Sequence, residues 1–397
     1  METEILLPAS KSISNRVLII RALAGSDAFI KNLSEAKDTK DLLNGLQTRN
    51  FEIYVGEGAT TLRFLIAYFA IIHRKIKLNC APTLQRRPIK VLLEILEQLG
   101  CQFNYLESEY QLPLEILQGV QENYSRKLNI DTTMSSQFVS AILLISPYLT
   151  EGLEIKYSED LVSEPYIKMT IKLMKEFGVE LIERNHTVCI LPSKYHFQNY
   201  TVEADWSAAC FFYAFLGILE TKNLYFPNLQ ISGLQGDEIL IQFFNQFGIL
   251  TLTETNGIKI IKTKKVKPDF VEFDFTNYPD LFPPISIFCA ITKTNALFKG
   301  LQHLVFKESN RLKVISDFLI SQKVKITHHH TGSGDLSADF EMSSFDYNIP
   351  QSYSSFNDHR IAMSFSLLNT IKKIEITNPE VVQKSFPGYW EELKKIF

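Results

Sequence analysis

The sequence lacks the charge excess and the long apolar runs that mark several broad classes of protein. Its 41 Lys and Arg residues face 44 Asp and Glu residues, for a formal net charge of -3. This balance argues against a general nucleic-acid-binding protein, which usually has a basic excess. A small anionic substrate needs only local positive charge, so the balance does not exclude one.

No apolar stretch is long enough for a membrane anchor. The longest, Ala208 to Leu219, has twelve residues, whereas a bilayer span needs roughly 18 or more. We therefore expect a buried helix at this position. The first ten residues, METEILLPAS, lack the basic-then-apolar layout of a signal peptide, and we expect none.

Cysteine is scarce and shows no metal-binding or redox spacing. The five cysteines are scattered and include no CxxC pair, which predicts reduced core thiols in a cytosolic protein. They are Cys80, Cys101, Cys189, Cys210 and Cys289.

A linker rich in proline, glycine and serine is also missing. The 397 residues nevertheless exceed one typical core, so we expect two domains that divide near Val202 to Trp206. A tight hinge of this kind suits two domains that close on a ligand.

What the sequence does have is an alternation of two kinds of helix, repeated six times. The first kind begins at a small or polar loop and continues as an almost wholly apolar stretch, which predicts a helix inside a domain. A β-like run follows most of them. Six copies of one α/β unit, roughly three in each half, thus account for most of the chain. The six stretches are SKSISNRVLIIRALAG, GATTLRFLIAYFAII, TMSSQFVSAILLISPYL, ADWSAACFFYAFLGIL, YPDLFPPISIFCAI and FNDHRIAMSFSLLNTI.

The second kind of helix is amphipathic. In RPIKVLLEILEQLG, Pro88 suits the first turn, and Gly100 suits a left-handed cap at the carboxyl end. Two further copies end at Gly178 and Gly248, and three weaker copies share the layout. The stretch LTLTETNGIKIIK predicts a hairpin with its turn at Asn256-Gly257.

Reactive side chains gather at the starts of the apolar helices. Helix N-termini carry unpaired N–H groups and about half a positive charge, so they attract phosphates and carboxylates. If these helices point inward, their starts converge and predict an anion site between the domains. The residues concerned are Lys11, Arg63, Ser135, Ser136, Asp205, Asp280 and Arg360.

Each of these residues also has a simpler interpretation when it is taken alone. The candidates for ordinary helix caps are Ser12, Ser135, Ser163, Asp205 and Asp280. Arg16 or Arg63 could lie on a solvated helix face, and the run Lys307 to Arg311 could be an ordinary charged helix start. For His328-His329-His330 we expect a loop tip rather than a metal site, because no Cys or carboxylate lies beside it at ligand spacing.

Ten segments carry a resemblance that extends, in order, through nearly the whole chain. They are LPASKSISNR, GATTLRFL, RRPI, SSQF, SEPY, EADWSAA, YPD, KESNRL, NDHRIAM and KSFPGY. With these segments the chain resembles the 5-enolpyruvylshikimate-3-phosphate synthase family. The combination of SKSxSNR, KExxRL and DHRxAM is highly specific, whereas any one of them alone is weak.

The resemblance implies a fold and a reaction. The fold is α/β (α+β), an inverse α/β barrel in which two similar domains each contain three βαβαββ units. One lobe would be residues 11–203 and the other residues 1–10 with 204–397, with the active site in the cleft between them. The implied enzyme is a cytoplasmic monomer that joins phosphoenolpyruvate to shikimate 3-phosphate in chorismate and aromatic amino acid biosynthesis. No metal or organic cofactor and no nucleic-acid or membrane partner is implied.

Ligand roles are implied for two overlapping groups of residues. Those for shikimate 3-phosphate are Lys11, Ser12, Arg16, Ser135, Ser136, Gln137, Ser163, Asp280 and Lys307. Those for phosphoenolpyruvate are Lys11, Arg87, Gln137, Arg311, Arg360 and Lys384. Arg63 and Tyr166 would lie beside these ligands. The many cations offset substrates that each carry a phosphate and a carboxylate.

The implied reaction is addition followed by elimination. Asp280 would accept the proton of the substrate 5-hydroxyl as this oxygen attacks C2 of phosphoenolpyruvate. Glu308, or Lys11 acting with it, would deliver a proton to C3, and both assignments stay open. Loss of phosphate would then reverse the proton movement at C3.

Three positions depart from the family pattern. The loop that usually reads GNAGTxxR is GEGATTLR here, with Glu57 for an asparagine and Ala59 for a glycine. The methyl group of Ala59 predicts tolerance to glyphosate and modestly weaker phosphoenolpyruvate binding. His303 stands where an asparagine usually helps to hold the shikimate moiety, which puts that contact in doubt.

Two other functions compete with this one. An enolpyruvyl transferase acting on UDP-N-acetylglucosamine would carry a reactive cysteine on a mobile loop, but here Cys80 precedes that loop and Arg86 to Ile89 occupy it. A non-catalytic phosphate-binding relative would need neither Asp280 nor Glu308. The sequence retains both carboxylates, together with Lys11 and Lys384.

Overall fold

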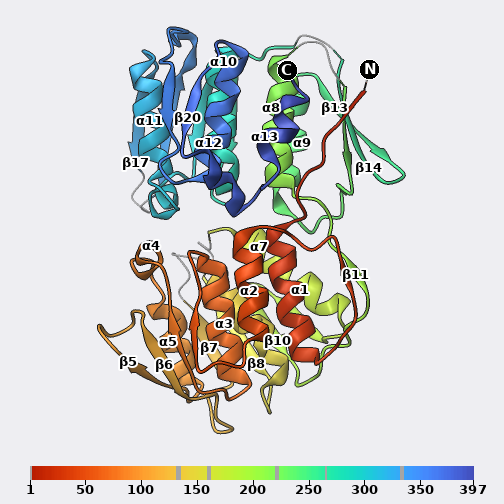
Figure 1. The fold of residues 1–397 in the computed structure, drawn as a ribbon, viewed down its shortest axis with the longest axis vertical. Coiled ribbons are helices and arrows are strands. Elements are labelled where there is room, and N and C mark those ends of the chain that lie inside the picture. The colour runs from red at the N-terminus through yellow and green to blue at the C-terminus, as the bar shows by residue number, and fades with distance from the viewer. Residues whose placement is uncertain (1, 131–135, 159–161, 220–222, 264–265, 331–334) are drawn as a thin grey trace. The chain divides into compact units, whose positions relative to one another are not determined.

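The structure is a computed structural model that describes residues 2–130, 136–158, 162–219, 223–263, 266–330 and 335–397. The chain divides into two compact units (Figure 1). The amino-terminal unit is Ser10–Val202, and the carboxy-terminal unit is Met1–Ala9 together with Glu203–Phe397. One continuous apolar cluster, from Ile5 to Ile396, forms the core of the carboxy-terminal unit.

The described residues of the amino-terminal unit form three sheets, and each sheet contains one parallel strand pair. In two of the sheets an antiparallel hairpin extends this pair to four strands. The first sheet pairs β2 (Ile30–Lys31) with β11 (Tyr200–Thr201). The second has the order β3 (Glu52–Tyr54), β4 (Ile76–Asn79), β6 (Leu114–Gln118), β5 (Gln102–Tyr105). The third has the order β7 (Lys127–Ile130), β8 (Leu153–Tyr157), β10 (Thr187–Ile190), β9 (Leu181–Arg184).

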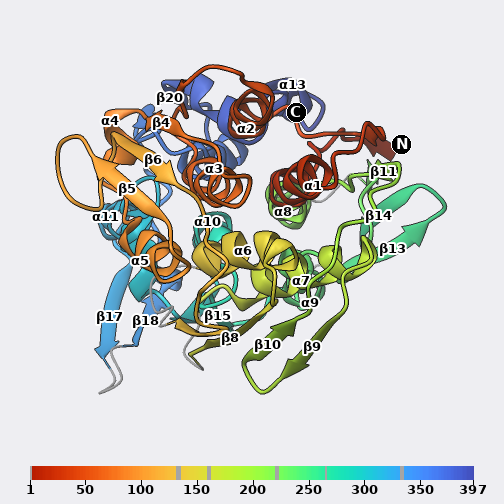
Figure 2. The same ribbon diagram turned by 90° about the horizontal axis from the view of Figure 1, so that it is seen from below.

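Three apolar helices contact one another within the amino-terminal unit. They are α1 (Lys11–Ala24), α3 (Ala59–Ile71) and α6 (Ser136–Ile145), of which Figure 2 shows α1 and α3 nearly end-on. Nearly every residue of α3 and α6 is buried, as expected for helices that are apolar all round. Three amphipathic helices pack beside them and bury one face: α2 (Lys37–Gln47), α5 (Lys90–Gln98) and α7 (Glu164–Glu176). Two short helices, α4 (Pro82–Gln85) and η1 (Ser146–Tyr148), complete the helices described here.

The carboxy-terminal unit repeats this pattern of sheets. Its first sheet has the order β1 (Glu2–Glu4), β12 (Asn223–Pro227), β14 (Gly257–Lys262), β13 (Ile249–Glu254). The second has the order β15 (Phe270–Asp274), β16 (Asn295–Lys299), β18 (Leu336–Glu341), β17 (Lys325–His330). The third pairs β19 (Ser352–Ser354) with β20 (Glu375–Thr377). Because β1 pairs with β12, the first residues of the chain belong to the unit that contains its carboxyl end.

The helices of the carboxy-terminal unit again fall into two kinds. The buried apolar helices are α8 (Trp206–Ile218), α10 (Phe282–Thr292) and α12 (His359–Phe365). The helices beside them are α9 (Leu240–Asn245), α11 (Arg311–Ser321) and α13 (Tyr389–Lys394). Short 3₁₀ helices lie at η2 (Gly236–Ile239), η3 (Pro279–Leu281), η4 (Gln302–Phe306), η5 (Met342–Ser344), η6 (Ser366–Thr370) and η7 (Pro379–Lys384).

The predicted sixfold α/β repeat is therefore confirmed, with three sheets in each unit. Within the described residues, four sheets have the parallel pair and the hairpin, whereas the β2–β11 and β19–β20 sheets have the pair alone. The left-handed backbone expected after the amphipathic helices is also present, since φ is +87° at Gly100, +89° at Gly178 and +75° at Gly248.

Three local predictions are wrong. The hairpin loop consists of Thr255 and Asn256, and Gly257 already pairs with Glu254; a side chain at Gly257 would collide with the carbonyl of Phe226 on β12. The three histidines end strand β17 rather than forming a loop tip, and His329 lies 2.7 Å from Asp339 of β18. Helix α5 begins at Lys90, so Pro88 precedes the helix.

The Ala208 to Leu219 run forms most of α8 and is buried as far as Gly217, as predicted. Within the part of the chain that the structure describes, no helix has both the length and the apolar character needed to cross a membrane. All five cysteines are free, and all but Cys189 are buried.

Candidate active site

Arg16 is a buried cation of the amino-terminal unit. It is 2% exposed, and its Nε donates to Oγ1 of Thr170 at 2.7 Å. Its Nη2 donates to Oγ of Ser140 and to the carbonyl of Tyr166, both at 3.1 Å, and its Nη1 donates to the carbonyl of Ser12 at 2.9 Å. Burial lowers its pKa to about 10, so the guanidinium stays charged at neutral pH. All of these acceptors are uncharged, so the positive charge suits an anionic ligand.

The start of α1 holds a helix cap, Ser10, and a predicted site residue, Lys11. Ser10 caps the helix, because its Oγ accepts from the backbone N–H of Ile13 at 3.5 Å. The cap interpretation of Ser12 is therefore wrong. Lys11, the first residue of α1, donates from Nζ to Asp38 of α2 at 2.9 Å. An anionic ligand of Lys11 would compete with this carboxylate.

Arg63, Arg87 and Gln137 come together at a second place in the amino-terminal unit. Arg63 of α3 is buried, and its Nη1 donates to Oε1 of Gln137. Its Nη2 donates to the carbonyl of Pro88 at 2.9 Å, and its guanidinium lies 4.7 Å from the ring centre of Phe138. Burial, and then the charge of Arg87, lower the pKa of Arg63 to about 9. Two neighbouring cations repel each other, and an anion bound between them would relieve that repulsion.

Two of the predicted serines, Ser136 and Ser163, lie at the starts of α6 and α7. Ser136 is the first residue of α6 and is buried, whereas Ser135 lies outside the described residues. Ser163 precedes α7 with φ of +64° and makes no capping hydrogen bond, so the cap interpretation is wrong for Ser163. Tyr166 lies in the first turn of α7, with its ring centre 5.9 Å from the Arg16 guanidinium.

Arg311 is the centre of a charged network in the carboxy-terminal unit. It is 1% exposed and contacts three carboxylates: Nη1 lies 2.7 Å from Asp280, Nη2 2.7 Å from Glu308, and Nε 2.8 Å from Asp358. Burial alone would lower the pKa of Arg311, but the three negative charges raise it above its usual value. Arg311 does begin a helix, α11, but a buried guanidinium with three carboxylate partners is more than an ordinary charged helix start.

Asp280 lies in η3 between two guanidinium groups. Its Oδ1 accepts from Arg311, and its Oδ2 lies 2.7 Å from Nη2 of Arg360. Burial favours the protonated form of Asp280, but Arg360, Arg311 and Lys307 together outweigh burial and hold its pKa well below the usual range. The carboxyl is ionised at neutral pH and serves as an ion-pair partner rather than as a helix cap.

Two more predicted residues, Glu308 and Lys384, lie close together at this network. Glu308 Oε1 lies 3.8 Å from Nζ of Lys384, which ends η7. Asp205, by contrast, is an ordinary helix cap, since its Oδ1 accepts from the N–H of Ala208 at 2.9 Å.

Comparisons with known proteins point to one family. The family model of EPSP synthase (3-phosphoshikimate 1-carboxyvinyltransferase) matches residues 46–393. The 3-phosphoshikimate 1-carboxyvinyltransferase of Bacteroides fragilis (strain YCH46) is 33% identical over 397 residues, which cover 100% of this chain and 95% of the relative. The enzyme of that name from Syntrophobacter fumaroxidans is 28% identical over 424 residues and is covered to 97%.

The chain belongs to the EPSP synthase family. It is a transferase that moves the enolpyruvyl group of phosphoenolpyruvate to shikimate 3-phosphate in aromatic biosynthesis. The crystal structure of EPSP synthase from Acinetobacter baumannii has the same fold, with a TM-score of 0.78 at 20% identity, over 100% of this chain and 95% of that one. The acceptor UDP-N-acetylglucosamine is not favoured.

Two carboxylates that contact the predicted site residues were not themselves predicted. Asp358 is fully buried; it caps α12 by accepting from the N–H of Arg360 at 2.9 Å, and it also accepts from Oγ of Ser309 at 3.0 Å. Asp38 is the partner of Lys11. The position of Asp358 in NDHR was the signal for the first, whereas the sequence around Asp38 resembles any acidic first turn.

His303, for which the resemblance implied an asparagine position, is buried in η4. Burial, and then the charge of Lys307, lower its pKa to about 3. The imidazole is therefore neutral at physiological pH and has one donor and one acceptor nitrogen.

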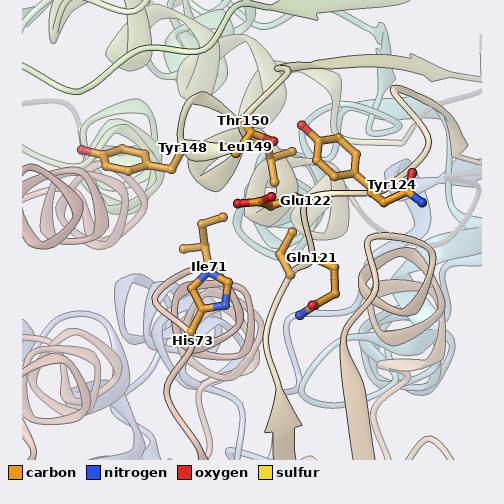
Figure 3. A pocket seen from close by; sticks show the side chains of 10 residues that line it. Ile71, His73, Gln121, Glu122, Tyr124, Tyr148, Leu149 and Thr150 are labelled. Carbon is orange, nitrogen blue, oxygen red and sulfur yellow. The ribbon is translucent and has the colours of Figure 1, made fainter.

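A separate cavity of about 540 Å³ lies in the amino-terminal unit, near the end of α3 (Figure 3). Its lining includes Ile71, His73, Glu122, Tyr124 and Tyr148, and none of the predicted ligand residues. Among the described residues, no group of three or more His, Cys, Asp or Glu side chains is arranged to hold a metal ion.

Proposed function

We propose that Asp280 is the general base of this enolpyruvyl transfer. It would accept the proton of the shikimate 3-phosphate 5-hydroxyl while that oxygen forms its bond to C2 of phosphoenolpyruvate. The ionised state of Asp280 between Arg311 and Arg360 supports this role. A carboxylate held so firmly is a weak base, and it gains basicity when an anionic ligand draws the two guanidinium groups away.

That ligand would be the carboxylate of phosphoenolpyruvate. Arg311 and Arg360 offer planar, paired N–H donors, which suit a carboxylate. Lys384 of the same unit, and Lys11, Arg87 and Gln137 of the amino-terminal unit, would hold its other oxygens. The closeness of Arg63 and Arg87 supports an anion site there.

The residues proposed for shikimate 3-phosphate come from both units. Arg16 would offset its phosphate, together with hydroxyl and N–H groups at the starts of α1, α6 and α7. The residues proposed for this ligand are Lys11, Ser12, Arg16, Ser135, Ser136, Gln137, Ser163, Asp280 and Lys307. The uncharged environment of Arg16 supports the assignment.

The proton at C3 would pass through Glu308, or through Lys11 acting with it. Its addition at C3 completes a tetrahedral intermediate that still carries the phosphate. Removal of a proton from C3 then re-forms the double bond as phosphate leaves. Glu308 lies between Arg311 and Lys384, which supports a carboxylate able to exchange a proton within a cationic environment.

The decisive experiment measures phosphate release from phosphoenolpyruvate with each acceptor. We expect release with shikimate 3-phosphate and none with UDP-N-acetylglucosamine. Asp280→Asn should lower kcat by at least about a hundredfold and leave shikimate 3-phosphate binding in place. The control is Asp317→Asn, which changes an exposed pair with Lys313. Full turnover by Asp280→Asn would refute the role of Asp280.

We further propose that residues 11–203 and residues 1–10 with 204–397 act as the two lobes of a cytoplasmic monomer that binds no nucleic acid. The net charge of -3 and the five free cysteines support this proposal. Light scattering would test the monomer: we expect a mass near 45.6 kDa, and a multiple of that mass would contradict it.

A further inference from the structure

A second buried carboxyl lies beside the Asp280 network. Asp237 belongs to η2 and is buried, and its Oδ2 accepts a hydrogen bond from Oγ of Ser207 in the first turn of α8. The same segment is anchored through Gln235, whose Oε1 accepts from the N–H of Trp206 at 3.0 Å and whose Nε2 donates to Glu203 at 2.7 Å. Asp237 is therefore held rigidly at the start of α8.

Charges from several elements act on Asp237. Burial, and then the negative charge of Asp280 in η3, raise its pKa to about 7. The Ser207 hydrogen bond and Arg360 of α12 act in the opposite direction, whereas Asp205 before α8 adds to the rise. Cys210 of α8 is another titratable neighbour; burial raises its thiol pKa well above the usual value, so Cys210 is uncharged.

The two carboxyls beside Arg360 are not equivalent. Asp280 is bonded to the guanidinium groups of Arg311 and Arg360, whereas the hydrogen bond to Asp237 comes from a neutral hydroxyl. Two nearby carboxyls with environments this different titrate separately, so Asp280 is already ionised at a pH where Asp237 still holds its proton.

We propose that Asp237 is a positioning residue that works in its protonated form and leaves Arg360 available to Asp280 and to the carboxylate of phosphoenolpyruvate. An ionised Asp237 would offer Arg360 a competing carboxylate and place a negative charge beside an incoming anion. Phosphoenolpyruvate should then bind more weakly. This inference rests on the roles proposed above for Arg360 and Asp280.

The first test compares the KM for phosphoenolpyruvate in wild type and Asp237→Asn between about pH 6 and about pH 8.5. The asparagine is an uncharged isostere of the protonated carboxyl, and titration of the substrate itself cancels in the ratio of the two KM values. The ratio of wild type to variant should rise by about three- to tenfold with pH, as expected for a coupling of up to one pKa unit. A ratio that stays constant with pH would overturn the proposal.

Ser207→Ala provides a second variant in which the carboxyl remains. Loss of the hydroxyl removes a donor that favours the ionised form, so the rise in KM should move to higher pH. A merely structural role for this hydrogen bond would not move the midpoint, and an unchanged or lower midpoint would contradict the proposal. Asp339→Asn, which changes an exposed carboxylate on β18, is the control and should reproduce the wild-type pH profile.

A stability measurement separates this inference from the proposed function. When the pKa of a carboxyl is higher in the folded state than in the unfolded state, the protein loses stability as the pH rises from the unfolded value to the folded value. The urea midpoint of Asp237→Asn relative to wild type should therefore increase from about pH 5 to about pH 8; parallel midpoints would show that Asp237 is not protonated in the folded state. If wild type releases no phosphate, the proposed function fails, and the pH dependence of phosphoenolpyruvate binding by calorimetry then tests Asp237 directly.

Discussion

Arg311 and Asp358 join the starts of two helices that lie 47 residues apart in the chain: Nε of Arg311 donates to Oδ2 of Asp358 at 2.8 Å. Both side chains are buried, at 1% and 0% exposure. Asp358 also caps α12, so one carboxylate positions Arg311 and Arg360 together. This carboxylate gives the cationic group of the carboxy-terminal unit its geometry.

Asp358→Asn should destabilise the protein by about 1.5–3 kcal/mol, because it replaces the charged acceptor of a buried hydrogen bond, while Asp280 and Glu308 still offset the charge of Arg311. Urea unfolding of the purified variant measures this change. Asp317→Asn, which alters an exposed pair with Lys313, should cost less than about 1 kcal/mol. Equal effects of the two substitutions would contradict the structural role of Asp358.

Arg16→Met should abolish the rise in Tm that shikimate 3-phosphate causes in wild type, since a ligand raises Tm only when it binds the folded state at the concentration used. The acceptors around Arg16 are neutral, so the unliganded variant should lose less stability than Asp358→Asn loses. Thermal unfolding with and without the ligand measures both. Arg74→Met is the control: Arg74 donates to the carbonyls of Thr48 and Asn50, and its loss should preserve the ligand response.

Ala59→Gly should make the enzyme more sensitive to glyphosate by about tenfold, the order expected for one methyl group in a tight pocket. Ala59 is buried at the first position of α3, directly after Gly58. The KM for phosphoenolpyruvate should fall modestly, and the KM for shikimate 3-phosphate should not change. Potent inhibition of wild type that Ala59→Gly leaves unaltered would refute the prediction.

His303→Asn should protect the protein against mild acid. The folded pKa of His303 is about 3 and the unfolded value is about 6.5, so the unfolded state takes up the proton first as pH falls. The wild-type protein therefore loses stability as the pH falls below the unfolded pKa, by about 2 kcal/mol at about pH 5. Asparagine does not take up this proton, so the variant should not show the loss. Urea midpoints at about pH 5 and about pH 7.5 test this; the same acid sensitivity in both proteins would show that His303 is not responsible.

The local sequence pattern was sufficient to predict the sixfold repeat. Six apolar runs and the glycines after the amphipathic helices predicted six α/β units, because burial and left-handed backbone leave direct marks on composition and spacing. Two units lack their hairpin within the described residues, and the position of the β13–β14 loop was missed by one residue. The reason is that Gly257 is required by close contact with β12, which is not a property of the hairpin itself.

The chain by itself determined the helix starts and the residue types that they carry: Lys11, Arg16, Arg63, Asp280, Arg311 and Arg360. Only the tertiary structure decided which charges meet. Asp358 forms an ion pair with Arg311, Asp38 forms one with Lys11, and Asp237 lies near Asp280. Spacing along a sequence describes contacts within one helix turn or one strand pair, whereas these partners come from different helices and, for Arg311 and Asp237, from different repeat units. Their ionisation depends on burial and on opposing charges that only the folded units provide.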